Sequence, residues 1–236
     1  IALLAADAFL PETKKHRLWE MAFGAILATT VILVFQRDRI GQTFDPMFVF
    51  DRFAYLFKSW FLLTALIVVL MARIFTLTLK ANVGELYVLI GSALLGMLVL
   101  ASASDLLLVF IGIELLTFSL YVMAAYLKTD ARSIEAGLKY LILGSVSSGF
   151  FVYGVALLYG ATGSTHFELV RAAISNGPPS PLATAGMLLV MAGLGFKIAA
   201  VPFHLWVPDV YEGAPTPVVA LLSVGSKMAG VVVLLR

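Results

Sequence analysis

The chain has 236 residues, of which 61% are hydrophobic and only 13% are charged, and its net charge is +2. Soluble domains carry about 25% charged residues, so this composition excludes an ordinary soluble protein and predicts a polytopic protein of the lipid bilayer. The small net charge gives no case for a nucleic-acid partner. The absence of cysteine excludes disulfides and thiolate-held zinc or iron–sulfur sites, and three scattered histidines provide no haem or metal constellation. We therefore expect no cofactor and no metal in this chain.

Apolar stretches predict about eight transmembrane helices, because one span needs about 20 apolar residues. Residues 1–10 are half a span and are interpreted as the end of a partial first helix. An apolar stretch is already under way at Ile1, and Arg236 directly follows another, so we expect a fragment cut at both ends. The other helices are expected at residues 17–35, 52–75, 84–102, 106–127, 133–160, 182–207 and 216–235. A polar connection at 36–51 and a loop at 161–181 separate some of them.

Basic residues are distributed unevenly over alternate connections. One side receives Lys14, Lys15, Arg17, Arg73, Lys80, Lys128 and Arg132, and the other receives Arg37, Arg39 and Arg171, with Arg52 at a boundary. Cytoplasmic connections carry the excess of Lys and Arg. The first set is therefore predicted to be cytoplasmic. Lys58, near the start of the third helix, is expected to snorkel to the interface.

Two predicted helices have unusual small residues or prolines. The helix at 133–160 contains Gly144, Ser145, Ser147, Ser148, Gly149 and Gly154. Small residues favour close helix packing, and the alternative is a local break in the helix. The helix at 182–207 contains Gly193, Gly195 and Pro202, which predict a discontinuous helix, either broken near Lys197 or bent at Pro202. Such interruptions mark ion sites in transporters.

Four charged side chains fall within predicted spans, and these are Glu114, Lys139, Lys197 and Lys227. A charge at the bilayer centre costs about 2.5–3.5 kcal/mol on insertion, so such residues are functional by default. Glu114 could instead be a protonated structural acid that is hydrogen-bonded to Thr117. Lys139 follows Glu135 by four residues, and an ordinary salt bridge explains it equally well.

Lys197 is the strongest candidate, because no acidic residue lies three or four positions away on its own helix. The structural alternative is a salt bridge to Glu114 without proton exchange. Lys227 continues a polar path with Ser223 and Ser226. These lysines are candidate proton-exchange groups.

His204 follows Lys197 by seven residues, which is the same helix face if the helix continues. Its side chain exchanges protons near neutral pH. The alternative is a structural histidine beside Trp206. Asp209, Tyr211 and Glu212 are expected in a solvated cytoplasmic turn.

Three segments carry a family resemblance: IELLTFSLYVMAAY, EAGLKYLILGSVSSGFFVYGVALLYGATGS and GFKIAAVPFHLWVPDVYEGAPTPV. With its Lys–x₆–His spacing, the chain from about residue 45 to 236 resembles the antiporter-like membrane subunits of the proton-pumping NADH:quinone oxidoreductase, respiratory complex I. Within that family it is most similar to the subunit N group, the counterpart of mitochondrial subunit 2.

The resemblance implies an all-α membrane fold in which residues 1–83 form N-terminal helices 1–3. Residues 84–236 would form one antiporter-like repeat of helices 4–8 with a discontinuous helix 7, and the second inverted repeat is absent. It implies a proton relay in which Glu114 pairs with Lys197. Lys139 is then the helix-six lysine, and Lys227 with His204 is the link towards the central hydrophilic axis.

The resemblance also implies the setting of the chain. It would be a non-redox subunit that moves protons while quinone is reduced elsewhere in the complex. NADH, FMN, iron–sulfur clusters and quinone would belong to other subunits, and other membrane-arm subunits would be its partners. The location would be a bacterial inner membrane.

Two other functions remain open at this point. A subunit of a multisubunit Na⁺/H⁺ antiporter would contain the same buried lysines, so these residues do not discriminate between the two. A purely structural membrane-arm subunit is the other alternative, because buried ion pairs can simply hold helices together.

Overall fold

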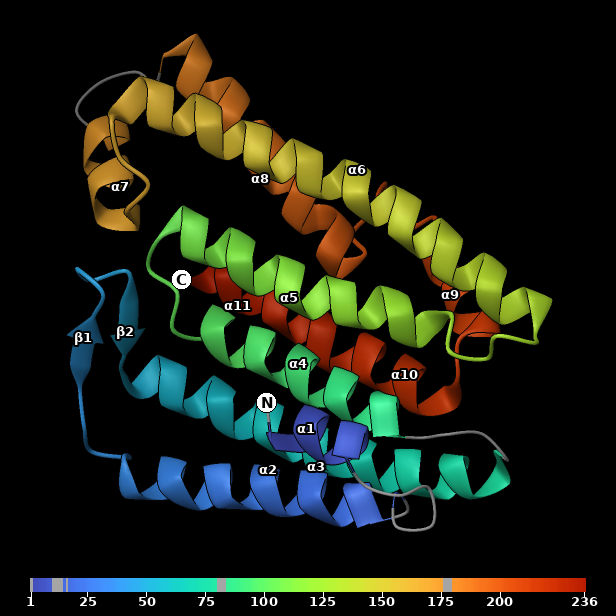
Figure 1. Ribbon diagram of the computed structural model, residues 1–236. Helices are drawn as coiled ribbons and strands as arrows, with labels where there is room; N and C mark the ends of the chain where they lie inside the picture. Colours follow the sequence, from blue (N-terminus) through green and yellow to red (C-terminus); the bar gives the residue numbers. More distant parts are fainter. Residues whose placement is uncertain (1, 10–14, 16, 80–83, 176–179) are drawn as a thin grey trace.

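A computed structural model describes residues 2–9, 15, 17–79, 84–175 and 180–236. Lys14 and Lys80, and the loop residues Asn176 to Pro179, lie outside this part of the chain. The described part is a bundle of helices with one short β-hairpin at one end (Figure 1). The all-α membrane fold predicted from the sequence is confirmed.

The predicted spans fall on helices, with small shifts of their ends. The elements are α1 (Ala2–Phe9), α2 (Leu18–Phe35), β1 (Gly41–Thr43), β2 (Phe48–Phe50), α3 (Arg52–Thr78), α4 (Gly84–Leu100), α5 (Leu106–Ala124), α6 (Ala131–Thr162), α7 (Phe167–Ser175), α8 (Pro181–Ile198), α9 (Val207–Gly213), α10 (Thr216–Ala220), the π-helical segment η2 (Leu221–Ser226) and α11 (Lys227–Leu235).

Six helices in the described residues are long and apolar enough to cross a membrane. They are α2, α3, α5, α6, α8 and the continuous run of α10, η2 and α11. Helix α4 is apolar but shorter, at 17 residues. Many large apolar side chains face outward from the bundle, as lipid contact requires.

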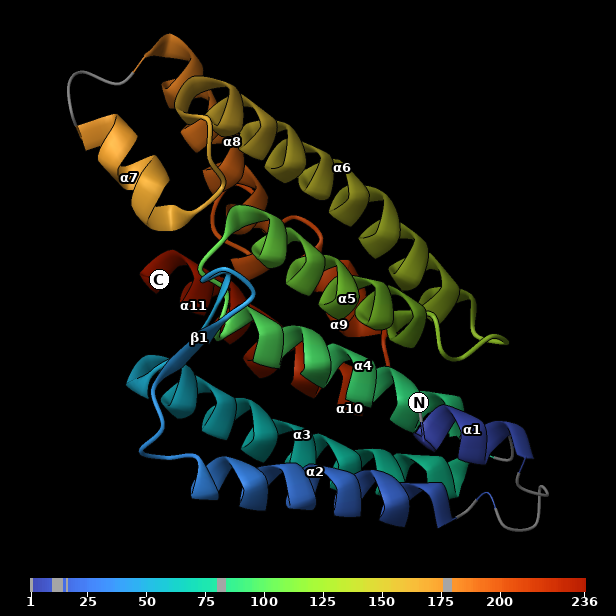
Figure 2. The same ribbon diagram turned by 60° about the vertical axis from the view of Figure 1, so that its left-hand side comes forward.

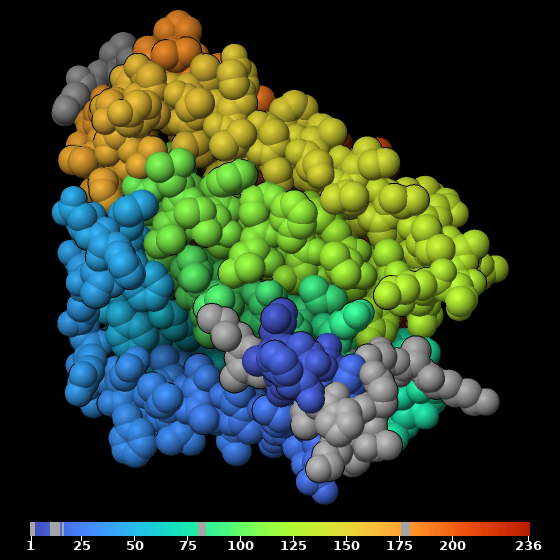
Figure 3. Space-filling model, viewed as in Figure 1, coloured from blue at the N-terminus to red at the C-terminus, as the bar shows by residue number. Residues whose placement is uncertain are grey.

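The helices are stacked in chain order. Figure 1 shows α2, α3, α4, α5 and α6 side by side, and the turned view in Figure 2 shows the same order. Helix α8 packs against α6, and α10 to α11 pack against α3, α4 and α8. In the space-filling view of Figure 3, α6 (yellow) and α2 (blue) lie along opposite edges.

Aspartate and serine side chains start the helices. Asp51, Asp105 and Asp130 each accept a hydrogen bond from a backbone N–H in the first turn of α3, α5 and α6. Ser180 does so for α8, where Pro181 occupies the first position. These caps satisfy N–H groups that have no partner within the helix. They fix where α3, α5, α6 and α8 begin.

Small residues let α6 and α8 approach closely. A Cβ added at Gly154 would lie 2.7 Å from the Gly186 carbonyl oxygen, and one at Gly193 would lie 2.7 Å from the Phe151 Cβ. Helix α6 is continuous through Gly144 and Ser148. Close packing is therefore the correct interpretation of the small-residue run, and a local break is not observed.

Two connections contain structure that the sequence analysis missed. Residues 36–51 contain the antiparallel hairpin β1–β2, and residues 161–181 contain helix α7. Lys58 does not snorkel: it is only 8% exposed, and its Nζ lies 4.6 and 4.8 Å from the ring centres of Phe48 and Phe50. The hairpin supplies those rings, so an unrecognised hairpin led to the wrong placement of the lysine.

The seventh predicted helix is broken one residue after Lys197. Helix α8 ends at Ile198, and Ala199 adopts the left-handed conformation with φ 58°. Turns follow until α9 begins at Val207. The expectation of one helix at 182–207 is therefore wrong in its extent, and the expected discontinuity is present at Lys197 rather than as a bend at Pro202.

Candidate functional site

The centre of the candidate site is a set of three side chains from three helices. Ser148 on α6 donates a hydrogen bond to Glu114 Oε1 on α5, with an O–O distance of 2.5 Å. The same serine oxygen accepts from Lys197 Nζ on α8 at 3.4 Å. Among the described residues, no carboxylate oxygen lies within 4.0 Å of the lysine nitrogen. The expected Glu114–Lys197 pair is therefore bridged by a hydroxyl and is not a direct salt bridge.

These groups lie away from solvent. Lys197 is 5% exposed and Ser148 is 8% exposed, and Glu114 is partly buried. A buried ammonium and a buried carboxylate must be compensated by hydrogen bonds or by each other. The Ser148 hydroxyl provides one donor to the carboxylate and one acceptor to the ammonium, so it serves both charges at once.

The interruption of the helix after Ile198 places Lys197 in the last turn of α8. Its side chain lies in the last turn of α8, where the free carbonyl groups favour a cation. The Ala200 amide closes the turn by donating to the Gly195 carbonyl at 2.8 Å, and the Trp206 indole donates to the Phe196 carbonyl at 3.2 Å. Two of the carbonyl groups at the end of α8, those of Gly195 and Phe196, are thus satisfied inside the protein.

Lys227 is the first residue of α11, the helix that packs against α8. A Cβ added at Gly230, one turn after Lys227, would be 3.7 Å from the Lys197 Cβ, so α11 passes directly beside the buried lysine. Lys227 Nζ lies 5.5 Å from the ring centre of Tyr211. The residue follows η2, a π-helical segment that contains both Ser223 and Ser226. Such segments are rare and frequently occur at functional sites.

An aromatic stack occupies the space next to the break. Tyr140 from α6 stacks on Trp206 at 4.7 Å between ring centres, and Trp206 also stacks on Phe196 at 5.4 Å. Tyr121 from α5 packs edge-on against Tyr140 at 4.8 Å. Trp206 is thus a structural anchor that holds the interrupted segment against α6.

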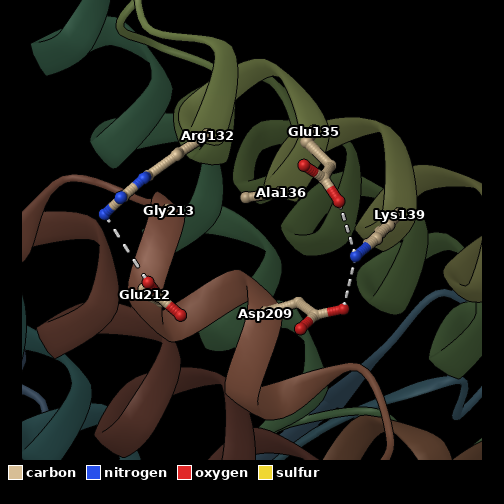
Figure 4. A pocket seen from close by; sticks show the side chains of 7 residues that line it. All are labelled: Arg132, Glu135, Ala136, Lys139, Asp209, Glu212 and Gly213. Carbon is tan, nitrogen blue, oxygen red and sulfur yellow. Dashed lines mark hydrogen bonds and ion pairs between the residues drawn. The ribbon is translucent and has the colours of Figure 1, made fainter.

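Lys139 lies in a different environment, near the N-terminal end of α6. Its Nζ is 2.7 Å from Glu135 Oε1 and 2.6 Å from Asp209 Oδ2, and Figure 4 shows the lysine between the two carboxylates. The side chain is 43% exposed. The pocket around it has a volume of about 220 Å³ and is also lined by Arg132 and Glu212, which form an ion pair at 3.6 Å. The salt bridge to Glu135 proposed from spacing is present.

The structure does not bring His204 to Lys197. Because α8 ends at Ile198, the seven-residue spacing no longer places the two side chains on one helix face. His204 lies in the turns between α8 and α9, and its side chain is exposed on the outside of this chain. Trp206, two residues later, is buried.

Two residues that contact the candidate lysines, Ser148 and Asp209, were not predicted from the sequence as site residues. Ser148 was assigned to helix packing, and Asp209 was assigned to a solvated turn. Thr117, the suggested partner of Glu114, instead donates to the Ile113 carbonyl of its own helix at 2.8 Å. Spacing along one helix can identify neighbours on that helix, but both missed contacts join different helices, so no periodic signal could reveal them.

The fold and the site together define a multi-pass integral membrane protein with a broken helix that presents a buried lysine to a carboxylate. A family model described as the transmembrane part of NADH:quinone oxidoreductase and Mrp antiporters matches residues 103–236. The chain belongs to this family.

Similar proteins are found in several bacteria. The chain is 43% identical over 219 residues to "NADH-quinone oxidoreductase subunit N 2" of Rhizobium meliloti, covering 93% of this chain and 46% of that protein. It is 40% identical over 238 residues to "NADH-quinone oxidoreductase subunit N" of Trichlorobacter lovleyi, covering 100% and 49%. The chain therefore spans about half the length of the curated relatives that it matches.

Solved structures share the fold. A chain of respiratory complex I from Thermus thermophilus matches with a TM-score of 0.83 at 33% identity, covering 100% of this chain and 50% of that chain. A chain of the membrane-bound sulfane sulfur reductase, an archaeal respiratory membrane complex, matches with a TM-score of 0.79 at 25% identity, covering 98% and 50%. The same helical unit thus occurs in two respiratory complexes.

Proposed function

We propose that this chain is part of a proton-translocating membrane-arm subunit of NADH:quinone oxidoreductase, of the subunit N group. The observation that supports it most is the arrangement of Lys197, Ser148 and Glu114 beside the end of α8. The names of the bacterial relatives and the likeness to a complex I chain point to the same function. The bacterial plasma membrane is its proposed location.

In this proposal, the buried pair is the site where a proton is held and released. Lys197 takes up or gives up its proton as its contact with Glu114 through Ser148 tightens or loosens. The end of α8 at Ile198 makes such a change possible, because a helix terminus can shift with less disturbance than a helix interior. Moving one charge against the membrane potential requires about 2.3 kcal/mol per 100 mV, which quinone reduction elsewhere in the complex must supply.

The other candidate residues have outer positions in the proposed relay. Lys139, with Glu135 and Asp209, provides proton-exchanging groups at the exposed pocket on the side predicted to be cytoplasmic. Lys227 passes the charge from α8 towards the central hydrophilic axis, because α11 lies against Lys197. His204 is exposed on this chain and is proposed to face further protein along that axis.

The proposed subunit has one antiporter-like repeat within this chain. We infer that residues 84–236 form one antiporter-like repeat and that residues 1–83 contribute the preceding helices. NADH, FMN, iron–sulfur clusters and quinone are proposed to bind other subunits, which are the partners of this chain. This chain would thus be a non-redox subunit of the enzyme.

The test uses the full-length subunit with Lys197→Ala, and separately with Glu114→Gln, in inverted membrane vesicles. Assembly is checked first on a native gel, and NADH oxidation and acidification are then measured together. We expect assembled complexes with depressed acidification in both variants. Normal proton-to-electron ratios in both would show that the lysine and the glutamate are structural.

A second candidate is a subunit of a multisubunit Na⁺/H⁺ antiporter, because the matching family includes Mrp antiporters. The same two variants separate the candidates when acidification is driven either by NADH or by a sodium gradient. A defect confined to sodium-driven exchange would favour the antiporter. A defect in NADH-driven acidification supports the complex I function.

A further inference from the structure

Three neighbouring serines on α6 have different partners. Ser145 donates to the Leu141 carbonyl of its own helix, and Ser147 donates to the Gly193 carbonyl of α8 at 3.1 Å. Ser148 donates to the Glu114 carboxylate and accepts from the Lys197 ammonium. Of these three hydroxyls, that of Ser148 is the one that bonds to charged side chains, and it bonds to two of opposite charge.

We propose that the Ser148 hydroxyl is the group through which a proton passes between Lys197 and Glu114, an inference that rests on the proposed function of this pair. The hydrogen-bond directions support it. The ammonium can only donate, and an ionised carboxylate can only accept, so a hydroxyl between them must accept from the first and donate to the second. The structure has this arrangement.

The transfer balances without any further reactant. One N–H bond of the Lys197 ammonium breaks as a new O–H bond forms on Ser148. The original O–H bond of Ser148 breaks as an O–H bond forms on Glu114. The products are a neutral amine, an unchanged serine and a neutral carboxylic acid, and no electrons are gained or lost. The serine hydroxyl must rotate before a second proton can follow in the same direction.

The two halves of the bridge differ in length. The Ser148–Glu114 distance of 2.5 Å is that of a short, charge-assisted hydrogen bond. The Lys197–Ser148 distance of 3.4 Å is well beyond the usual value of about 2.9 Å, so this link is loose. Ser148 is held on a continuous helix, whereas Lys197 is in the last turn before a break. A small movement of the end of α8 therefore closes or opens the bridge on the lysine side.

The packing around Ser148 fixes the position of its hydroxyl on α6. Helices α6 and α8 are in close contact through Gly154, Gly186 and Gly193. Both Ser148 and Lys197 are buried, so bulk water does not compete for their hydrogen bonds. A transfer group on a rigid, buried element is held in productive geometry, which accelerates transfer.

The experiment replaces Ser148 in the full-length subunit of the assembled complex and measures acidification and NADH oxidation in inverted vesicles. Ser148→Ala should lower acidification nearly as far as Lys197→Ala does, because a positioned proton-transfer group accelerates transfer by about 10²-fold or more. Ser148→Thr retains a hydroxyl and should restore most of the acidification. Ser147→Ala is the matched control: it removes a buried hydrogen bond to α8 without touching the charged pair.

A second pair of variants decides the result if Ser148→Ala does not assemble. Threonine and valine have nearly the same shape but differ in the hydroxyl, so Ser148→Thr should pump and Ser148→Val should not. Equal acidification by these two variants would overturn the inference, as would an equal loss in Ser147→Ala and Ser148→Ala. If Lys197→Ala lowers acidification but Ser148→Val does not, proton transfer through the Ser148 hydroxyl is refuted and the proposed function of the subunit is retained. Normal acidification in Lys197→Ala removes the proposed function itself.

Discussion

Lys139 and Lys197 are both intramembrane lysines by sequence, but the structure surrounds them in opposite ways. Lys139 is 43% exposed and has carboxylates at 2.6 and 2.7 Å. Lys197 is 5% exposed and has a serine hydroxyl at 3.4 Å as its hydrogen-bond partner. The lysine with the better ion pairs is the one that solvent can also reach.

If Lys197 is the proton-exchange group, as proposed, close salt bridges do not mark that group in this chain. Exposed ion pairs contribute only about 0.2–1 kcal/mol each, since water and salt replace them readily. A buried lysine without a direct carboxylate has no such substitute, so its protonation depends on the protein around it. The weakly held group is therefore the one that a conformational change can control.

The largest expected effect comes from separating the two charges of the buried set. Glu114→Leu leaves the Lys197 ammonium buried without the carboxylate to which Ser148 links it, and a buried charge that loses its counter-charge is strongly destabilising. We expect the complex that carries this variant to be lost at a lower temperature, as followed by native gels after heating. Adding Lys197→Met should restore thermal stability, because apolar residues of similar volume often replace a buried ion pair without loss.

The double variant also tests function. Acidification should stay low when stability returns, because both proton-exchanging groups are gone. A stable double variant with normal acidification would contradict the proton role and leave a purely structural pair. The outcome therefore separates a proton-transfer role of Glu114 and Lys197 from a structural one.

A medium effect is expected from moving the end of α8. Gly193→Ala adds a Cβ that would lie 2.7 Å from the Phe151 Cβ and 3.1 Å from the Ser147 carbonyl oxygen. Such overpacking costs about 1–3 kcal/mol and should push α8 away from α6. Because Lys197 follows one helical turn later, acidification should fall more than NADH oxidation in vesicles.

The matched control for that variant is Gly149→Ala on α6. A Cβ added there meets nothing within 4 Å. Alanine favours a helix interior over glycine by about 0.5–1 kcal/mol, so thermal stability should stay the same or rise. If both glycine variants behaved alike, packing between α6 and α8 would not control the position of Lys197.

The sequence could predict the spans and the discontinuity near Lys197, since these follow from local hydropathy and from Gly and Pro positions. It could also predict the contact between Glu135 and Lys139, because four residues separate them on one helix. The bridge through Ser148 joins three helices, and the hairpin that covers Lys58 depends on long-range packing. Neither contact produces a periodic pattern in the sequence, so neither could be predicted from it.

The positions of Lys197 and His204 also could not be predicted from their spacing in the sequence. The seven-residue spacing is a valid argument only for a continuous helix. The left-handed Ala199 ends that continuity, and alanine has no sequence signal for such a conformation, which glycine usually adopts. The spacing of Lys197 and His204 therefore does not predict where the histidine lies.

The smallest effect is expected at the exposed cluster. Lys139→Ala removes two ion pairs whose partners remain partly exposed, so the thermal stability of the complex should change only slightly. That change should shrink further as salt is raised, because exposed pairs are screened. Acidification should fall only slightly, since water can replace an exposed lysine at the outer pocket. Arg132→Ala, which breaks the neighbouring pair with Glu212, is the control and should give a similarly small change. If Lys139→Ala abolished acidification as fully as Lys197→Ala, burial would not distinguish the two lysines, and the outer cluster would be an obligatory step of the relay.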